Sequence, residues 1–328
     1  MIDPFGRRIS YLRLSVTDRC DLRCAYCMAE DAAFLPKADV LDLEELARLS
    51  GVFIGLGVRK LRLTGGEPLV RRGIMQLIGA LGEHVAAGRL AELTLTTNGT
   101  QLSRCAEGLA RAGMRRINVS VDSLDPALFH KITRRGDLTP VLEGIRAAKA
   151  AGLAVKINTV VMGGVNDQEI DRMIAWCGEE GHDLSLIEAM PLGEFSTGLD
   201  FQALPLGVLR ERLARRWTFV ATDYSSGGPA RYVTVEQTGR RLGFITPLSH
   251  GFCESCNRVR VSCTGRLFLC LGHEVGTDLR QPLRASASDA PVQEAIRRAI
   301  GQKPEGHDFV AQRASHQPLA RTMNQTGG

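Results

Sequence analysis

The sequence lacks any long apolar run. No stretch of its 328 residues reaches the roughly eighteen consecutive apolar residues that a membrane-spanning helix needs, so we expect no contact with a membrane. The first residues carry charge but no apolar segment typical of a signal peptide, and there is no low-complexity tract. These absences argue against a membrane protein and a disordered chain, and they predict a cytoplasmic protein.

Lysine is also scarce. Arginine greatly outnumbers it, yet the formal net charge is only +5, and so small and scattered an excess does not indicate nucleic-acid binding. Because guanidinium groups match phosphate oxygens, some arginines could converge on an anion; a base-composition bias would produce the same excess. With 44% hydrophobic residues, the chain can form one large α/β domain, or a main domain with an appendage.

Nine cysteines stand out in a chain without an export signal, which favours metal ligation over disulfides. Cys20, Cys24 and Cys27 lie in one short stretch, separated by three and two residues. Thiolates hold iron–sulfur clusters or zinc, and three of them would leave one iron of a four-iron cluster open for a small molecule. A zinc site completed by a distant fourth ligand, or a disulfide, is the alternative.

A second group of four cysteines lies towards the C-terminus. Its members are Cys253, Cys256, Cys263 and Cys270. Four cysteines would close a zinc site, whereas three would leave a second open iron, and the spacing alone favours neither. Arg258 and Arg260 would share one face of a strand beside this group, which suits an anionic ligand better than a structural zinc site.

Short apolar runs alternate with longer amphipathic segments from residue 10 to about residue 190. We expect strands at residues 11–16, 60–63, 92–96, 116–121, 154–161 and 184–187, and helices at 43–56, 71–86, 103–112, 140–151 and 167–178. This alternation predicts an incomplete (β/α)6 TIM-like barrel, with a doubly wound sheet as the alternative. Beyond residue 200 we expect a helix at 204–216, a loop at 223–229 and antiparallel strands at 231–235 and 242–245. The predicted domains are therefore a barrel, residues 1–200, and a C-terminal extension, residues 201–328.

The C-terminal ends of the predicted strands carry polar or special residues, and that is where parallel barrels place their active sites. The second strand runs into Gly65-Gly66-Glu67-Pro68, whose glycines let a ligand approach the backbone closely. Lys156 interrupts an apolar strand; it either faces a cavity or extends to the barrel rim. Met190 ends the sixth strand and is either a ligand contact or core filler.

Together these motifs resemble the GTP 3′,8-cyclase family, the molybdenum cofactor biosynthesis protein A family of the radical S-adenosylmethionine (SAM) superfamily. The resemblance runs nearly end to end, through residues 3–6, 11–18, 62–69, 95–99, 118–125, 156–160 and 252–260 and the terminal Gly327-Gly328. Cys263 departs from the family pattern, which has three cysteines in the second group.

The resemblance implies two [4Fe–4S] clusters and SAM as cofactors. The first cluster would be held by Cys20, Cys24 and Cys27, and the second by Cys253, Cys256 and Cys270. SAM would be bound by Tyr26, Gly66, Ser120 and Met190. The substrate GTP would be bound by Arg13, Arg62, Thr96, Lys156, Arg258, Val259 and Arg260. No protein side chain is assigned as the catalytic group, because the radical is generated at the first cluster.

The implied activity is that of a lyase, a radical SAM cyclase. It would convert GTP to (8S)-3′,8-cyclo-7,8-dihydroguanosine 5′-triphosphate, the first step of molybdenum cofactor biosynthesis. The resemblance also implies a homodimer, an external electron donor, a product passed to cyclic pyranopterin monophosphate synthase, and a terminal Gly-Gly that reaches the active site. The alternatives are a radical SAM enzyme that acts on a peptide and a zinc-stabilised nucleotide-binding protein.

Overall fold

Six parallel strands form the centre of the fold in the computed structural model, which describes residues 1–190, 199, 201–307 and 327. They are β1 (Tyr11–Ser15), β2 (Lys60–Thr64), β3 (Glu92–Thr97), β4 (Arg116–Ser120), β5 (Ala154–Val161) and β6 (Asp183–Glu188). Each strand pairs in parallel with the next along the chain. The six strands begin and end within one residue of the predicted bounds, and the predicted incomplete barrel is confirmed rather than the doubly wound sheet.

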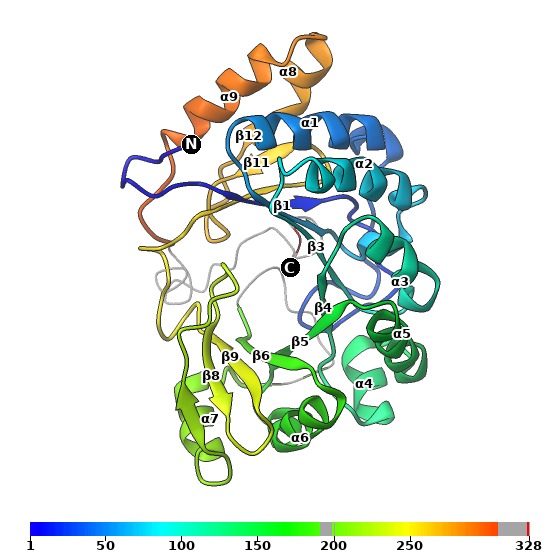
Figure 1. The fold of residues 1–328 in the computed structure, drawn as a ribbon, viewed down its shortest axis with the longest axis vertical. Helices are drawn as coiled ribbons and strands as arrows, with labels where there is room; N and C mark the ends of the chain where they lie inside the picture. The colour runs from blue at the N-terminus through cyan, green and yellow to red at the C-terminus, as the bar shows by residue number, and fades with distance from the viewer. Residues whose placement is uncertain (191–198, 200, 308–326, 328) are drawn as a thin grey trace.

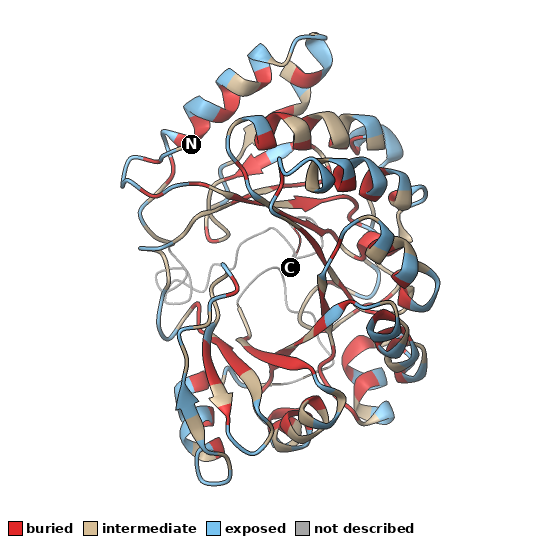
Figure 2. Ribbon diagram, viewed as in Figure 1, coloured by how far each residue is buried: buried red, intermediate tan, exposed pale blue. Residues whose placement is uncertain are grey.

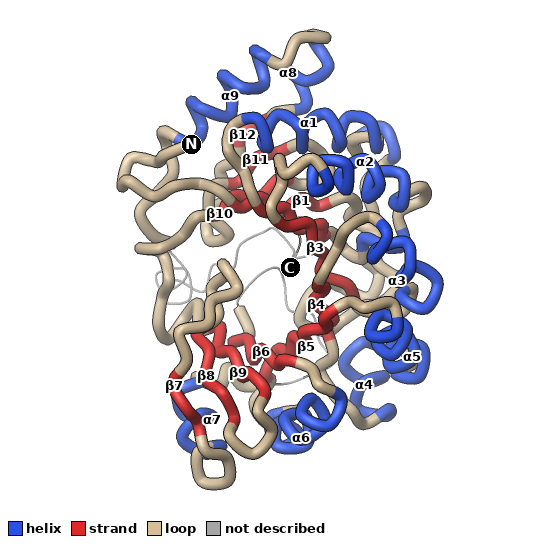
Figure 3. The backbone as a smooth tube through the Cα atoms, in the orientation of Figure 1, coloured by secondary structure: helices blue, strands red, loops and turns tan. Residues whose placement is uncertain are grey.

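Helices cover the outer side of this curved sheet (Figures 1 and 3). They are α1 (Leu43–Gly55), α2 (Ile74–Ala86), α3 (Leu102–Arg111), α4 (Pro126–Thr133), α5 (Leu138–Ala150) and α6 (Ile170–Glu180). Helix α1 begins at a capping box, in which the Glu45 amide donates to the Asp42 carboxylate (2.7 Å) and the Asp42 amide donates to Glu45 (2.9 Å). Helix α4 begins at an Asp125 N-cap followed by proline, and it was not expected from the sequence.

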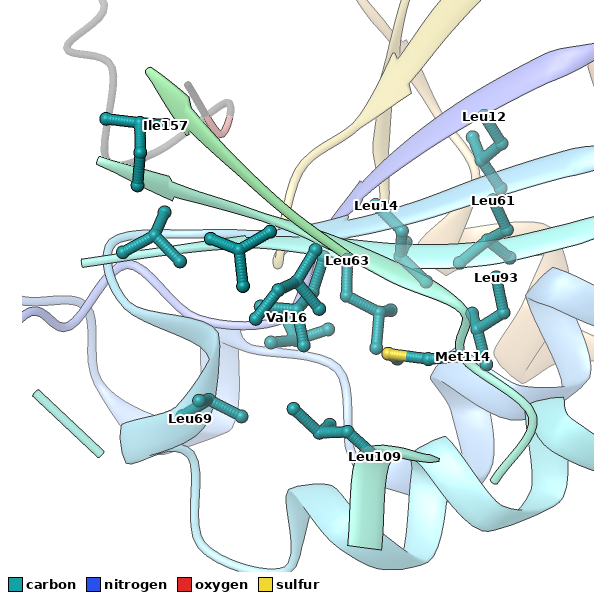
Figure 4. Close-up of a cluster of buried hydrophobic side chains, with 14 of the residues drawn as sticks. Leu12, Leu14, Val16, Leu61, Leu63, Leu69, Leu93, Leu109, Met114 and Ile157 are labelled. Atoms are coloured by element: carbon teal, nitrogen blue, oxygen red, sulfur yellow. The ribbon is translucent and has the colours of Figure 1, made fainter. Parts of the chain in front are cut away.

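The core lies between the strands and the outer helices. Leu12, Leu14, Leu61 and Leu63 point outward from β1 and β2, are fully buried, and belong to one hydrophobic cluster with Leu109 of α3 (Figure 4). Burying each such side chain contributes about 1.5–3 kcal/mol. Figure 2 shows that burial is concentrated in the strands and on the helix faces turned towards them. Because the apolar residues of β1 and β2 face outward, the intervening positions face the inside of the barrel.

The C-terminal part of the chain extends the sheet at both edges. At one edge lie β10 (Arg258–Val261), β11 (Arg266–Phe268) and β12 (Thr277–Asp278); at the other lie β9 (Arg240–Ile245), β8 (Arg231–Val235) and β7 (Phe219–Ala221). Strand β10 pairs in parallel with β1, and β9 pairs in parallel with β6. The predicted antiparallel pair at 231–235 and 242–245 is confirmed as β8 and β9, whereas β10 to β12 were not anticipated. Both parts share one sheet, so the division at residue 200 stays a prediction.

Three further helices complete the described part of the C-terminal region. They are α7 (Leu206–Leu213), α8 (Arg280–Ala285) and α9 (Ala290–Ile300). Arg48 of α1 ties the α8–α9 connection to the barrel, since its guanidinium pairs with Asp289 (2.8 Å) and donates to the carbonyl of Leu283 (2.8 Å). Among the described residues, no helix has the length and apolar character needed to cross a membrane.

Candidate functional site

A cavity of about 300 Å³ lies inside the barrel, and all seventeen residues that the sequence analysis assigned to cofactor or substrate line it. They include three cysteines of each group, the four proposed SAM contacts and the seven proposed GTP contacts. A cavity of this size is at the lower end of the range for ligand sites. The structure therefore brings together residues as far apart in the sequence as Arg13 and Cys270.

The first cysteine group lies in the loop that follows β1, at the C-terminal end of the barrel. Within it, the Cys27 amide donates to the Cys24 carbonyl (2.9 Å), which makes a tight turn. The loop is anchored to α4, because the amide of Ala25 donates to the carbonyl of Ile132 (2.9 Å). These contacts fix the backbone of the loop, and all three of its cysteines line the cavity.

The Gly65-Gly66-Glu67-Pro68 turn packs directly against that loop. The amides of Gly66 and Glu67 donate to the carbonyls of Thr17 (2.9 Å) and Arg19 (2.8 Å). The Glu67 carboxylate is fully buried and accepts from the Thr97 hydroxyl (2.8 Å) and the Asn98 amide (2.6 Å), so it fixes the end of β3. Burial raises the pKa of Glu67 to about 7. The turn thus aligns the cysteine loop with the ends of two strands.

Acidic and apolar surroundings make the first group a poor place for free thiolates. Burial, followed by the nearby Glu67 and Asp21 carboxylates and Cys27, raises the pKa of Cys20 to about 12. Burial and Asp122 also raise the pKa of Cys24 well above its ordinary value. Without a cation, these groups would stay protonated; bound iron would supply the charge that stabilises the thiolates.

The second cysteine group lies at the opposite, N-terminal end of β1. Cys256 comes two residues before β10 and Cys270 two residues after β11, and these strands are antiparallel, so the two cysteines meet at the same end of the hairpin. The Cys256 amide donates to the Cys253 carbonyl (3.0 Å), which brings the third cysteine alongside. The register pairs Tyr11, the first residue of β1, with Arg258, so this end of the barrel lies opposite the first group.

Cys263 lies at the other end of the same hairpin. It follows β10 in the turn that leads to β11, it is 1% exposed, and it is not part of the cavity wall. Burial and then Asp18 raise the pKa of its thiol to about 12. The four-cysteine arrangement that the sequence left open is therefore not formed, and Cys263 is a buried thiol behind the sheet.

A four-iron cluster fits both groups better than a single metal ion does. Within the described ranges, no three His, Cys, Asp or Glu side chains are placed to hold one metal ion between them. A zinc ion needs its sulfur ligands at about 2.3 Å from one point, whereas each cysteine of a four-iron cluster binds a different iron. The donor sets, three thiols at each end of one cavity, fit two such clusters.

A cationic wall lines the cavity between the two groups. The parallel register places Arg260, Arg13 and Arg62 side by side across β10, β1 and β2. A second row lies two residues closer to the N-terminal end of each strand, on the same face, and consists of Arg258, Tyr11 and Lys60. The cavity therefore has two adjacent rows of side chains that carry five cations.

The charges in this wall repel one another and are poorly solvated. Burial, followed by Arg13 and Arg258, lowers the pKa of Arg260 well below its ordinary value. Burial and the cations Arg62 and Arg116 lower the pKa of Lys156 to about 7. Such a concentration of buried positive charge is destabilising by itself, and a bound polyanion would relieve it.

Hydrogen bonds fix the orientation of the side chains in the cationic wall. The Arg62 guanidinium donates to the Tyr11 hydroxyl (2.6 Å) and to Thr96 (3.1 Å), and Lys156 donates to the Tyr232 hydroxyl (3.2 Å). Burial raises the pKa of Tyr11, but Arg62, Arg13 and Lys60 outweigh burial and lower it to about 7. Tyr11, Lys60 and Tyr232 were not predicted as site residues. The first two could have been found, since they lie two positions before Arg13 and Arg62.

The proposed SAM contacts lie towards the first cysteine group. The Tyr26 hydroxyl donates to the Asp122 carboxylate (2.7 Å), and burial raises the pKa of Asp122 to about 6. Ser120 ends β4, and Met190 follows β6. Two buried oxygens, Thr64 Oγ1 and Asn118 Oδ1, have no hydrogen-bond partner in the part of the chain that the structure describes, and both residues line the cavity. Unsatisfied polar atoms at a cavity wall are typical of a ligand site.

Gly327, near the end of the chain, contacts residues of the cavity wall. Arg260 donates to the carbonyl of Gly327, and Gly327 lies so close to Thr64 that an added side chain would overlap the threonine hydroxyl. Residues 308–326 and Gly328 lie outside the described residues. The position of Gly327 agrees with the expectation that the end of the chain reaches the site.

Comparisons with known proteins agree with this geometry. Residues 14–177 match the Radical SAM superfamily model, and residues 182–309 match the Molybdenum Cofactor Synthesis C model. The chain is 60% identical to a GTP 3′,8-cyclase of Rhodopseudomonas palustris (strain TIE-1), covering 100% of this chain and 96% of that one. It is 58% identical to a GTP 3′,8-cyclase of Mesorhizobium japonicum, covering 100% and 99%.

Among solved structures, Streptococcus suis SuiB bound to S-adenosylmethionine has a similar fold. It has a TM-score of 0.65 at 17% identity, with 97% of this chain and 77% of SuiB covered. That likeness concerns the fold alone, whereas the sequence relatives are similar over their whole length. The chain therefore belongs to the GTP 3′,8-cyclase family of the radical SAM superfamily.

Proposed function

We propose that this chain is a GTP 3′,8-cyclase, which converts GTP to (8S)-3′,8-cyclo-7,8-dihydroguanosine 5′-triphosphate in the first step of molybdenum cofactor biosynthesis. The observation that carries the proposal is the single cavity with a cysteine group at each end and a cationic wall between them. An enzyme that uses a SAM-derived radical to take a hydrogen atom from a nucleoside triphosphate needs all three features in one enclosed space.

The cysteines would hold two [4Fe–4S] clusters, with Cys20, Cys24 and Cys27 on the first and Cys253, Cys256 and Cys270 on the second. When bound, the first cluster and SAM supply a radical able to take a hydrogen atom from a ribose carbon. The chain's own residues position the reactants. Tyr26, Gly66, Ser120 and Met190 would hold SAM beside the first group.

The cationic wall would bind the triphosphate of GTP. Arg13, Arg62 and Arg260 present guanidinium forks side by side, and such forks match phosphate oxygens. Thr96, Lys156, Arg258 and Val259 would complete the GTP contacts along the same wall. Holding the triphosphate here would place the nucleoside between the two cysteine groups and exclude water from it.

Anaerobic reconstitution tests the proposal. We expect about eight irons and eight acid-labile sulfides per chain, with 5′-deoxyadenosine and a cyclised GTP formed only when GTP, SAM and a strong reductant are all present. One or two zinc ions per chain would instead support a zinc-stabilised nucleotide-binding protein. Two clusters without GTP-dependent turnover would favour a peptide substrate.

A second prediction concerns pH. Because the pKa of Lys156 is lowered to about 7, the free enzyme loses this charge as the pH rises above 7, and GTP binding must then restore a proton. We expect the Kd for GTP to rise between about pH 7 and pH 9, by up to about tenfold per pH unit. Lys156→Arg keeps its charge at every pH and should flatten this dependence. The measurement is anaerobic titration calorimetry at several pH values.

Tyr11 provides the control for that experiment. Its pKa is also about 7, and its deprotonation would place a negative charge in the wall and weaken binding in the same pH range. Tyr11→Phe should remove the Tyr11 part of the dependence and leave the Lys156 part. If Lys156→Arg shows the same pH dependence as the parent protein, Lys156 does not contact the triphosphate.

We also propose a homodimer in the cytoplasm that takes electrons from an external donor and passes its product to cyclic pyranopterin monophosphate synthase. These proposals rest on the family to which the chain belongs. Sedimentation analysis tests the dimer. Transfer of the product to the purified synthase, with and without an excess of inert protein, tests the hand-off.

A further inference from the structure

Lys303 is buried directly behind the second cysteine group. It follows α9, is 3% exposed, and is one of the few lysines in the chain. Its ammonium donates to the carbonyl of Arg258 (3.1 Å) and to the carbonyl of Leu269. Arg258 lies two residues after Cys256, and Leu269 immediately precedes Cys270. One side chain therefore joins the two separate segments that carry the cysteines.

The surrounding backbone strengthens the same connection. Arg7 donates to the carbonyls of Cys253 (2.8 Å), Pro304 (2.6 Å) and Glu305 (2.7 Å), so the segment that follows Lys303 is tied to the first cysteine of the group. Arg7 is itself paired with Asp3 (2.6 Å), and its charge is thereby balanced. Lys303 differs in this respect, because its hydrogen-bond partners within the described part of the chain are both neutral carbonyls.

A buried ammonium that meets only neutral carbonyls needs a negative group nearby. Lysine is almost never fully buried unless its charge is paired, since desolvation of an unpaired charge costs several kcal/mol. Because both carbonyls that it bonds belong to residues within two positions of a cysteine, the thiolates of a bound cluster would supply that negative charge.

The Lys303 ammonium lies beside the second cysteine group, since each carbonyl that it bonds is within two residues of one of the cysteines. The reduction potential of an iron–sulfur cluster depends on the charge and hydrogen bonds around it, and reduction adds a negative charge that a nearby cation stabilises. A second cluster, when bound, would therefore be easier to reduce with a charged Lys303 than without it.

We propose that Lys303 is a positioning residue for the second cluster, which holds its two cysteine-bearing segments together and whose buried positive charge raises the cluster's reduction potential. This inference rests on the proposed function, because it requires that the second group bind a cluster. Lys303 does not contact the substrate cavity and acts only through the cysteines and their backbone. Its loss should thus affect the second cluster and spare the first.

Three substitutions separate the charge from the hydrogen bonds. Lys303→Arg keeps both, Lys303→Gln keeps an amide donor without the charge, and Lys303→Met keeps neither. We expect Lys303→Met to lose iron from the second site to a chelator about tenfold faster than the parent protein. We expect Lys303→Gln and Lys303→Met to shift the midpoint potential of the second cluster to more negative values, while Lys303→Arg restores it. The potentials are measured by redox titration with electron paramagnetic resonance.

The first cluster, in the same molecule, is the internal control, and Lys149→Met, an exposed lysine on α5, is the matched control. We expect the midpoint potential of the first cluster to be unchanged in every Lys303 variant, and both potentials to be unchanged in Lys149→Met. A second-cluster potential unchanged in Lys303→Gln and Lys303→Met, in protein with full iron, would overturn the proposal. If Lys303→Met does not fold, the comparison of Lys303→Arg with Lys303→Gln decides in the same way. A parent protein with about four irons would instead refute the second cluster, and with it the proposed function.

Discussion

A Gly66→Ala variant is expected to lose the first iron–sulfur cluster while it keeps the second. A Cβ at this position would lie 2.6 Å from the carbonyl carbon of Arg19 and 2.8 Å from the carbonyl oxygen of Asp18. Both atoms belong to the backbone that leads into Cys20, so no side-chain rotation can relieve the contact. The cysteine loop must move, and the hydrogen bond from the Glu67 amide to the Arg19 carbonyl (2.8 Å) is lost with it.

The expected magnitude is large, because a displacement of about 1 Å at a reacting centre can cost a factor of about 100 in rate. Iron should fall from about eight to about four per chain, and formation of 5′-deoxyadenosine should fall at least about 100-fold. Iron and sulfide analysis, together with chromatography of the nucleoside product, measures both. The four remaining irons would show that the rest of the barrel has folded.

Gly207→Ala is the matched control. Gly207 lies in α7, where an added Cβ meets no atom within 4 Å. We expect full iron content and a slight gain in stability, about 0.5–1 kcal/mol, because alanine is the better helix former. Normal iron content and normal SAM cleavage in Gly66→Ala would show that the close approach of the turn to the cysteine loop is not required.

The sequence predicted the parts of the site that depend on short spacings. The three cysteines within eight residues, the glycine turn after β2 and the apolar periods of six strands are local patterns, and the structure agrees with each of them. The pairing of strands that lie far apart in the sequence could not be predicted from such local patterns. Nothing local indicates that β10 pairs with β1, yet this pairing sets Arg260 beside Arg13 and Arg258 beside Tyr11.

Cys263 shows the same limit. Its spacing from Cys256 and Cys270 is compatible with a four-cysteine site, and only the direction of the β10–β11 hairpin decides which end it occupies. Lys303 was missed for a related reason, because it lies in a polar segment without periodicity and acquires its role only by folding back on Arg258 and Leu269. In this chain, the ligand role of the cysteines could be predicted from their spacing along the sequence. The separation of the two cysteine groups to opposite ends of the barrel could be seen only in the fold.

A Gly327→Ala variant should keep both clusters and lose turnover. Gly327 is buried at the cavity with a φ of +76°, where a non-glycine residue is strained by about 1–2 kcal/mol. A methyl group here would also overlap the side chain of Thr64 at the end of β2. Residue 327 would have to leave this position, and Arg260 would lose its bond to the carbonyl there.

Because Gly327 lies between the cationic wall and the glycine turn, its displacement would open the cavity to water and free Arg260 from its fixed orientation. We expect about eight irons per chain and at least a roughly 100-fold loss of cyclised GTP in end-point and rate assays. Gly181→Ala is the control with the same backbone strain, since its φ is also +76° but an added Cβ meets nothing within 4 Å. That variant should lose about 1 kcal/mol of stability in thermal unfolding and keep its turnover. If Gly327→Ala and Gly181→Ala form cyclised GTP at similar rates, Gly327 is not needed to exclude water from the cavity. The barrel itself would then have to exclude it.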